Sequence, residues 1–301
     1  MPRPTGQARS KAKAKTAAKP RARSRSDKGG RRSPASKGMV LVTGASRGIG
    51  AELAKQFAQG GHDLVLVARN AGQLLELATA IRDDYGRWAT TVALDLGEPG
   101  AAQKLYQQLR REDIEIDVLV NNAGLLDNGE FTAIPMGDHL QLINLNIAVL
   151  TALTHQFLAP MRARGSGRIL NVASLASLQP VPNLAVYAAS KAYVLSLTEA
   201  LSEELKGSGV TVTALCPGFV RTDMTVGSNA EGNDLHLPSA LMLSPQFVAE
   251  EGYEACMKGE TIRVPGLGGR LVAGFTELQP RAVRRLTAGL LGRVLLKKDP
   301  S

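Results

Sequence analysis

The chain has 301 residues, of which 44% are hydrophobic and 21% are charged, with 31 glycines and 15 prolines. This composition is typical of a globular protein and excludes global disorder, a collagen-like repeat and a coiled-coil array. The length fits one large α/β domain or two small domains. Cys216 and Cys256 are too few for a disulfide scaffold or a four-ligand zinc site, so we expect reduced thiols in an intracellular, cytoplasmic protein.

The net charge of +9 is unevenly distributed along the chain. Residues 1–38 carry 13 basic side chains and one acid, Asp27, whereas the rest of the chain has a net charge of −3. Residues 1–38 also lack Val, Leu, Ile, Phe, Trp and Tyr, so we expect a disordered basic arm. A secretory signal would need an apolar region that this arm lacks. A mitochondrial transit segment would fit the basic, acid-poor composition but also needs an apolar helix face. An electrostatic contact with nucleic acid or anionic lipid needs only the charge, and a solvated tail without a partner is the other alternative.

From Met39 onward, short apolar runs alternate with amphipathic stretches of helix length. The predicted strands are Met39–Thr43, Asp63–Ala68, Thr90–Leu94, Asp117–Val120, Arg168–Ala173 and Val210–Leu215, with a short edge strand at Thr261–Val264. The predicted helices are Ile49–Gln59, Gly72–Tyr85, Pro99–Arg111, Gly137–Arg164 and Tyr187–Lys206. Most of the strand runs are rich in Val, Leu and Ile without polar alternation, which is typical of strands buried on both faces. The pattern therefore predicts a doubly wound α/β fold with a parallel sheet.

Two uncharged stretches, His139–Met161 and Ile169–Ser190, are long enough to raise the question of a membrane span. The first contains several polar residues, among them Asn144 and Asn146, and the second contains two prolines. We expect both stretches to be buried elements of the fold.

A glycine-rich turn, Thr43-Gly44-Ala45-Ser46-Arg47-Gly48-Ile49-Gly50, leaves the first predicted strand and enters the first predicted helix. Glycines are needed where the backbone takes a positive φ or lies close to a ligand. The start of the helix offers free N–H groups and a positive dipole end to a pyrophosphate. In the first βαβ unit this arrangement is typical of a dinucleotide site. The predicted cofactor contacts in the turn are Gly44, Ser46, Arg47, Gly48, Ile49 and Gly50.

The end of the second predicted strand, Val67-Ala68-Arg69-Asn70, carries no acidic residue. Sites for NAD usually place an acid at this point, where it binds the ribose 2′-hydroxyl. Arg69 and Arg47 could instead pair with a 2′-phosphate. The sequence therefore favours NADP as the cofactor.

Further motifs follow in chain order after the glycine-rich turn. They are Asn121-Asn122-Ala123-Gly124 after the fourth predicted strand, Ser174 after the fifth, Tyr187-Ala188-Ala189-Ser190-Lys191 at the start of the last predicted helix, and Pro217-Gly218 after the sixth strand. With the turn, this ordered set resembles the short-chain dehydrogenase/reductase family, in its short single-domain branch, over about Met39 to Gly266. The resemblance implies a Rossmann-like sheet in the order 3-2-1-4-5-6-7.

The residues themselves indicate the chemistry of a carbonyl reduction. Such a reaction needs a hydride for the carbon and a proton for the developing alkoxide. A free tyrosine has a pKa of about 10, too high for reversible proton transfer near neutral pH. Lys191 lies four residues after Tyr187, on the same helix face, so we expect its charge to lower the pKa of Tyr187. Ser174 can donate a hydrogen bond to the substrate oxygen.

The resemblance implies the same roles, with Tyr187 as general acid and base and Lys191 also holding the nicotinamide ribose. It also implies that Asn146 holds a water that connects Lys191 to solvent, although Val149 stands where the family commonly has glycine; Asn144 is an alternative. The other cofactor contacts that it implies are Asp95, Asn121, Gly124, Pro217, Gly218 and Thr222. Because family members are commonly dimers or tetramers, we expect a homo-oligomer.

The remaining regions carry weaker signals. The segment Asp223–Ser244 is expected to form an apolar lid over the substrate or an ordinary packed loop. In Gly268–Lys298, apolar and basic residues alternate around Pro280, which predicts two short helices that pack on the domain, on a second subunit or on a membrane surface. No metal site is expected, because the histidines lack ligand spacing; they are His62, His139, His155 and His236.

The sequence therefore predicts three parts: a basic arm at 1–38, a catalytic domain at 39–266 and a basic helical extension at 267–301. The predicted function is hydride transfer between NADP(H) and a carbonyl/alcohol pair, with an apolar ketone such as a ketoacyl or steroid-like compound as substrate. Two alternatives stay open: a cofactor-binding scaffold without turnover, and a protein that binds polyanions through its arm.

Overall fold

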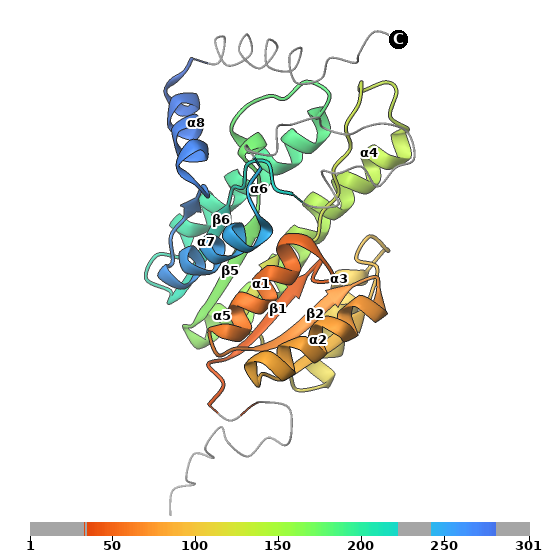
Figure 1. The fold of residues 1–301 in the computed structure, drawn as a ribbon, viewed down its shortest axis with the longest axis vertical. Helices are drawn as coiled ribbons and strands as arrows, with labels where there is room; N and C mark the ends of the chain where they lie inside the picture. The colour runs from red at the N-terminus through yellow and green to blue at the C-terminus, as the bar shows by residue number, and fades with distance from the viewer. Residues whose placement is uncertain (1–32, 34, 222–241, 281–301) are drawn as a thin grey trace, which may run out of the picture. The chain divides into compact units, whose positions relative to one another are not determined.

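A parallel sheet of seven strands runs through the protein in the order β3-β2-β1-β4-β5-β6-β7 (Figure 1). The computed structural model describes residues 33, 35–221 and 242–280. The strands are β1 (Met39–Thr43), β2 (Asp63–Ala68), β3 (Ala89–Ala93), β4 (Val118–Asn121), β5 (Gly167–Val172), β6 (Val210–Leu215) and β7 (Ile262–Arg263). The predicted order is confirmed, each strand boundary falls within one residue of its prediction, and β7 lies at the edge.

Helices cover both faces of the sheet. They are α1 (Gly48–Gln59), α2 (Ala71–Tyr85), α3 (Ala101–Arg111), α4 (Met136–Ile143), α5 (Leu150–Arg164), α6 (Ala185–Glu204), α7 (Pro245–Lys258) and α8 (Leu267–Leu278). Helices α1, α2 and α7 pack on one face, and α3, α5 and α6 pack on the other. The doubly wound α/β architecture is therefore confirmed.

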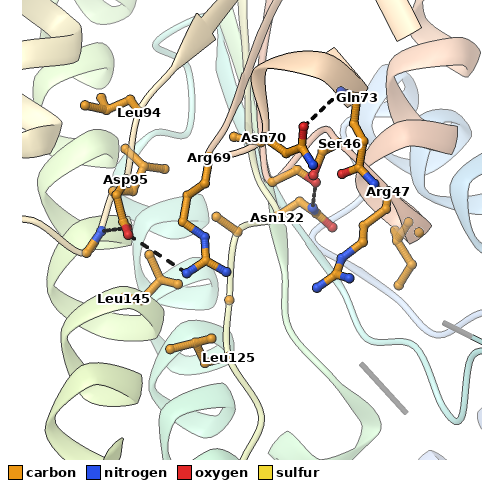
Figure 2. A pocket seen from close by; sticks show the side chains of 18 of the residues that line it. Ser46, Arg47, Arg69, Asn70, Gln73, Leu94, Asp95, Asn122, Leu125 and Leu145 are labelled. Atoms are coloured by element: carbon orange, nitrogen blue, oxygen red, sulfur yellow. Dashed lines mark hydrogen bonds and ion pairs between the residues drawn. The ribbon is translucent and has the colours of Figure 1, made fainter. Parts of the chain in front are cut away.

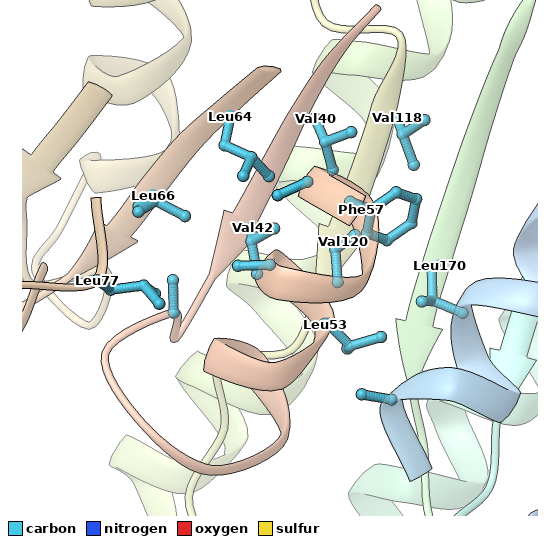
Figure 3. Close-up of a cluster of buried hydrophobic side chains, with 14 of the residues drawn as sticks. Val40, Val42, Leu53, Phe57, Leu64, Leu66, Leu77, Val118, Val120 and Leu170 are labelled. Carbon is cyan, nitrogen blue, oxygen red and sulfur yellow. The ribbon is translucent and has the colours of Figure 1, made fainter. Parts of the chain in front are cut away.

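The core explains why the strands are apolar without alternation. On one face, Val40 and Val42 of β1 pack with Phe57 of α1 (Figure 3). On the other face, Met39 and Leu41 of the same strand belong to a second buried cluster. Since helices cover both faces, successive residues of β1 are buried against different helices. Four of the five positions are therefore apolar, and the fifth, Thr43, donates a hydrogen bond to the Val120 carbonyl oxygen.

Helix α7 was not predicted from the sequence, although it packs against α1 in the core. Its start has recognisable signals: the Ser244 side chain accepts a hydrogen bond from the Phe247 N–H at 3.2 Å, and Pro245 occupies the first turn. A Cβ at Gly252 would lie 2.7 Å from a Leu215 methyl group, so glycine lets α7 approach the sheet closely. The apolar face of α7 is built of small residues, which makes its periodicity weak.

The long helix predicted over Gly137–Arg164 is continuous but changes type. A π-helical segment, η2 (Asn144–Val149), separates α4 from α5. By length and a mean hydropathy of 1.4, the stretch Met136–Arg164 could cross a membrane. Helix α5 packs Leu153 and Phe157 into the core, as expected for a buried element, whereas Leu140 and Ile143 of α4 are exposed, so the predicted stretch is buried only in part.

Candidate active site

The predicted phosphate-binding turn joins β1 to α1 and is held in place by β4. Gly44 and Gly48 take positive φ angles of +64° and +58°. A Cβ at Gly50 would overlap the Gly44 carbonyl oxygen, so only glycine fits where the turn meets the helix. The Asn122 side-chain amide donates to the carbonyl oxygens of Thr43 and Gly44 at 3.0 and 3.1 Å. The turn therefore has one backbone conformation, fixed by a residue from a neighbouring strand.

The start of α1 suits a phosphate group. Arg47 takes the N-cap position without a side-chain capping bond, and the first turn of the helix contains no acidic residue. The first-turn N–H groups of a helix need an acceptor from outside the helix, and the positive end of its dipole favours an anion. The donor set at this turn therefore fits the pyrophosphate of a dinucleotide.

A cavity of about 390 Å³ lies over the carboxyl ends of β1 to β4, beside this turn (Figure 2). Eight of the predicted cofactor residues line it: Gly44, Ser46, Arg47, Gly48, Ile49, Arg69, Asp95 and Gly124. Residues that the prediction missed also line it, among them Asn70, Gln73, Asn122 and Gln141. Asn122 could have been predicted, because it belongs to the same motif as the predicted contacts Asn121 and Gly124. No pattern in the sequence around Gln141 indicates a cofactor contact.

The cavity has a basic side chain, Arg69, at the end of β2. Arg69 is an exposed side chain that extends toward Asp95 at 3.9 Å (Figure 2). Asp95 also accepts a hydrogen bond from the Gly97 N–H at 2.9 Å. At the position where an NAD site usually has an acid, Asn70 instead caps α2 by accepting from the Gln73 N–H. An exposed pair such as Arg69–Asp95 is weak, so the guanidinium can exchange this partner for a ligand anion.

A second cavity, of about 90 Å³, continues the groove toward α6. It shares Ile49, Asn122, Gly124 and Leu125 with the first cavity. The other predicted residues that line it are Ser174, Tyr187, Lys191, Pro217 and Gly218. Residues from β4, β5 and β6 and from α6 therefore meet at one end of a continuous groove, as the motifs predicted.

The environment of Tyr187 differs from the expectation. Burial raises the pKa of the Tyr187 phenol above its usual value, and a hydrogen bond with Ser174 acts in the opposite direction. The net shift is therefore opposite to the lowering that we expected from Lys191, although Lys191 Nζ lies over the Tyr187 ring, 5.8 Å from its centroid. Sequence spacing placed the two residues on one face correctly, but it could not show how far burial removes water from the phenol.

Lys191 is itself buried, with only 6% of the residue exposed. Its Nζ donates a hydrogen bond to the Val172 carbonyl oxygen at the end of β5, at 2.8 Å. Burial lowers the pKa of Lys191 to about 8, because the interior disfavours the charged ammonium. The amine is therefore held at a fixed point of the groove and titrates much nearer to neutrality than an ordinary lysine.

Asn146 joins α6 to the loop after β4. It lies in the π-helical segment η2, where its Oδ1 accepts from the Leu125 N–H at 2.8 Å. Its Nδ2 donates to the Leu125 carbonyl and to Ser190 Oγ, and Ser190 Oγ donates in turn to the Tyr187 carbonyl at 2.7 Å. Asn144, the alternative, donates to the Gly97 carbonyl instead. Asn146 therefore lies at the catalytic end of the groove, and Ser190 is a neighbour that the prediction missed.

Asn121 lies beneath the groove and lines neither described cavity. Its side-chain amide donates to Thr154 Oγ1 and to Asn171 Oδ1, at 3.0 and 2.9 Å, which links β4 to α5 and β5. Its side chain therefore supports the sheet, while the residues that follow it reach the groove. Thr222 and most of the predicted lid, Asp223–Ser244, lie outside the described residues.

Comparison with known proteins agrees with this architecture. The family model for short chain dehydrogenases matches residues 38–233. The ketoacyl reductase HetN of Nostoc sp. is 36% identical over 226 residues, which cover 75% of this chain and 77% of that protein. The structure of a short-chain dehydrogenase from Sphingobium yanoikuyae in complex with NADPH is 32% identical, with a TM-score of 0.71, and covers 88% of this chain and 99% of its own.

A structure of the bulky-bulky ketone specific alcohol dehydrogenase from Comamonas testosteroni is also similar, at 26% identity and a TM-score of 0.68 over 88% of this chain and 96% of that one. The fold, the groove and these matches lead to one conclusion. The chain belongs to the short-chain dehydrogenase/reductase family, a family of oxidoreductases that bind a nicotinamide cofactor.

Proposed function

We propose that the protein reduces an apolar ketone or aldehyde with NADPH. The observation that carries the proposal is the meeting of Ser174, Tyr187 and Lys191 at the end of a groove that begins at a phosphate-binding turn. A bound reduced nicotinamide would supply the hydride. The chain would supply the groups that hold the carbonyl oxygen and protonate it.

The proton donor in this proposal is Tyr187. Because burial raises its pKa, the phenol stays protonated near neutral pH and suits the role of general acid in the reducing direction. Ser174 donates a hydrogen bond to the carbonyl oxygen and stabilises the charge that develops there. Lys191 holds the cofactor ribose, and its pKa of about 8 lets Nζ exchange a proton close to neutrality.

Several observations support NADP. Arg69 and Arg47 line the cavity at the positions that would face a 2′-phosphate, and no acid stands at the end of β2. Arginine binds phosphate through paired N–H donors. The similar dehydrogenase from Sphingobium yanoikuyae was solved with NADPH. In the proposed site, Asp95 contacts the adenine side, and Pro217, Gly218 and Thr222 close over the nicotinamide.

The proposed substrate class is an apolar ketone. The described wall of the catalytic cavity includes Leu125, Leu126, Val172 and Val220. The relatives that reduce ketoacyl groups or bulky ketones are consistent with this class. We keep the proposed division into an arm at 1–38, a catalytic domain at 39–266 and an extension at 267–301. The described end of the arm differs from the expected disorder, because the Ser33 N–H donates to Asp63 and the Lys37 N–H donates to the Gly61 carbonyl oxygen. We also propose that the protein is a homo-oligomer in the cytoplasm. Its two cysteines, Cys216 and Cys256, are buried and form no disulfide, which is consistent with a reducing compartment.

A carbonyl screen tests the proposal directly. The full chain is mixed with NADPH or NADH and with β-ketoacyl thioesters, keto-steroids and short aldehydes, and the absorbance of the reduced cofactor is followed. We expect turnover with apolar ketones and a preference for NADPH.

Tyr187→Phe is the matched variant for this screen. Removal of one hydroxyl group should lower kcat by about a thousandfold or more, within the range of general acid catalysis, and leave NADPH affinity nearly unchanged. Fluorescence titration of NADPH checks the second half of this expectation. Turnover in the variant would refute Tyr187 as the acid, and NADPH binding without turnover of any carbonyl would favour a cofactor-binding scaffold.

A further inference from the structure

Helix α8 exposes its large apolar side chains and buries its small ones. The exposed side chains form one stripe, at intervals of four, four and three residues. This α8 stripe consists of Leu267, Leu271, Phe275 and Leu278, which are 77%, 75%, 67% and 87% exposed. Among the helix residues whose burial is described, Ala273 and Thr276 are the buried ones. A helix that packs on a domain normally does the opposite, with its large apolar residues facing the core.

Such a stripe indicates an interaction surface. Single exposed leucines are common on proteins, but a contiguous row of four large apolar side chains on one helix is not. The intervals keep all four residues on the same side of the helix. The stripe therefore fits a flat apolar partner that covers the whole length of α8.

The charges of the chain point to the chemistry of that partner. Directly after α8, residues 281–301 contain six basic side chains and one acid, Asp299. Residues 39–280 contain 17 basic and 25 acidic side chains, so the cationic sequence is concentrated at the two ends of the chain. The basic sequence after α8 would repel the same sequence in a second copy of the chain, whereas an anionic bilayer would attract it and accept the apolar stripe.

We propose that the α8 stripe docks onto an anionic lipid surface. The apolar side chains enter the boundary between headgroups and acyl chains, and the basic sequence after α8 adds electrostatic attraction. Helix α8 also contacts the turn η3 (Leu175–Leu178), which directly follows Ser174. If the proposed function holds, docking would bring the catalytic end of the groove close to apolar ketones dissolved in the membrane.

Vesicle flotation with the full chain tests the docking without using enzyme activity. The probes are vesicles of phosphatidylcholine alone and of phosphatidylcholine mixed with phosphatidylglycerol. We expect binding to the mixed vesicles that weakens with added salt, and much weaker binding to phosphatidylcholine alone. In Leu271→Gln/Phe275→Gln, binding to the mixed vesicles should fall by roughly tenfold or more, because two apolar anchors are lost.

The matched control is Leu75→Gln/Leu140→Gln, which removes two exposed leucines from α2 and α4 and should leave vesicle binding unchanged. Leu267→Gln/Leu278→Gln changes the ends of the stripe and provides a second, independent test. All of these side chains are exposed, so the melting temperature should not change. A chain without residues 1–31 keeps the hydrogen bonds that Ser33 and Lys37 make to the domain, and it should still bind the mixed vesicles and still depend on the stripe.

Three outcomes overturn the proposal: no binding to the mixed vesicles, equal binding by the α8 variants, or binding that depends only on residues 1–31. A fourth is a change of oligomeric mass in the α8 variants, measured by light scattering, without a change in vesicle binding. That result would identify a second copy of the chain as the partner. Because the readout is flotation, failure of the docking proposal is separate from failure of the proposed reaction.

Discussion

The two ends of the groove are built in different ways. At the cofactor end, the turn after β1 is held by backbone geometry at Gly44 and Gly50, and the charged group, Arg69, is an exposed side chain. At the catalytic end, Lys191 and Asn146 are buried and fixed by hydrogen bonds to elements distant in the sequence. The first end depends on glycine conformation and on one amide, Asn122, that donates to the turn, whereas the second depends on buried polar side chains.

This difference predicts how each end responds to mutation. A change in the turn should alter cofactor affinity first, because in the proposed function the turn holds the cofactor phosphates. A change at the buried end should alter the chemical step and also the stability, because burying polar groups lowers the free energy of unfolding unless they are paired. The experiments below separate these two responses.

The largest effect is expected for Lys191→Met. Turnover should fall by about a thousandfold or more, since the variant loses the amine beside Tyr187. The same variant should be more stable than the natural chain at pH 7, by about 1–3 kcal/mol, because a buried charge is removed. Thermal unfolding and steady-state kinetics on one preparation measure both effects.

The pH dependence of that stability gain has a defined sign. The pKa of Lys191 is about 8 in the folded protein, below the ordinary value of 10.5. Between these two values the unfolded chain binds a proton that the folded chain does not, so the natural protein gains stability as pH rises. The advantage of Lys191→Met should therefore shrink from pH 8 to pH 10.5. An advantage that stays constant over this range would contradict the lowered pKa.

Gly50→Ala tests the cofactor end. A Cβ at this position overlaps the Gly44 carbonyl oxygen, so the turn must move. We expect the free energy of unfolding to fall by about 1–3 kcal/mol. The affinity for NADPH should fall by roughly a hundredfold, because the phosphate-binding N–H groups are displaced.

The control for this change is Gly137→Ala, in the first turn of α4, where an added Cβ meets no atom within 4 Å. Alanine is favoured over glycine in a helix, so this variant should be as stable as the natural chain or slightly more so. If both variants bind NADPH equally, close approach at Gly50 does not control the turn.

The sequence predicted the sheet and the turn because both leave local patterns. Continuous apolar runs such as Met39–Thr43 can only be buried on two faces, and Gly44, Gly48 and Gly50 follow at fixed spacing. The preference for NADP could also be predicted at the end of β2, because the absence of an acidic residue there is visible in the sequence. Helix α7 was missed, since its buried residues are small and its periodicity is correspondingly faint.

At the catalytic end, the sequence predicted which residues meet but not their environment. The spacing of Tyr187 and Lys191 placed them on one helix face, and the family resemblance added Ser174 to the same site; the structure brings all three to one cavity. The raised pKa of Tyr187 depends on how much water the fold removes, which no local pattern records. Ser190 was missed for the same reason, because its partner Asn146 lies 44 residues away.

Arg69→Ala sharpens the comparison at the cofactor end. Loss of an exposed guanidinium should leave stability unchanged, since its pair with Asp95 is long and solvated. The affinity for NADPH should fall by about tenfold, while the affinity for NADH stays nearly constant, because only NADPH carries the 2′-phosphate. Arg82→Ala removes a similarly exposed arginine of α2 and serves as the control. Equal losses for the two cofactors would make Arg69 an ordinary surface charge.

The smallest effect is expected for Ser190→Ala, which tests whether hydrogen bonds at the buried end position the catalytic turn. The variant leaves the Asn146 amide with one donor unpaired and should lower the free energy of unfolding by about 1–3 kcal/mol. We expect kcat to fall by about threefold to tenfold with little change in KM, because Tyr187 is slightly displaced. Ser202→Ala is the matched control, since Ser202 also donates to the carbonyl three residues earlier in α6 but has an exposed environment. A variant that loses stability but keeps kcat would show that Ser190 only supports the fold. The hydrogen bonds that connect Asn146, Ser190 and the Tyr187 carbonyl oxygen would then not position Tyr187 for catalysis.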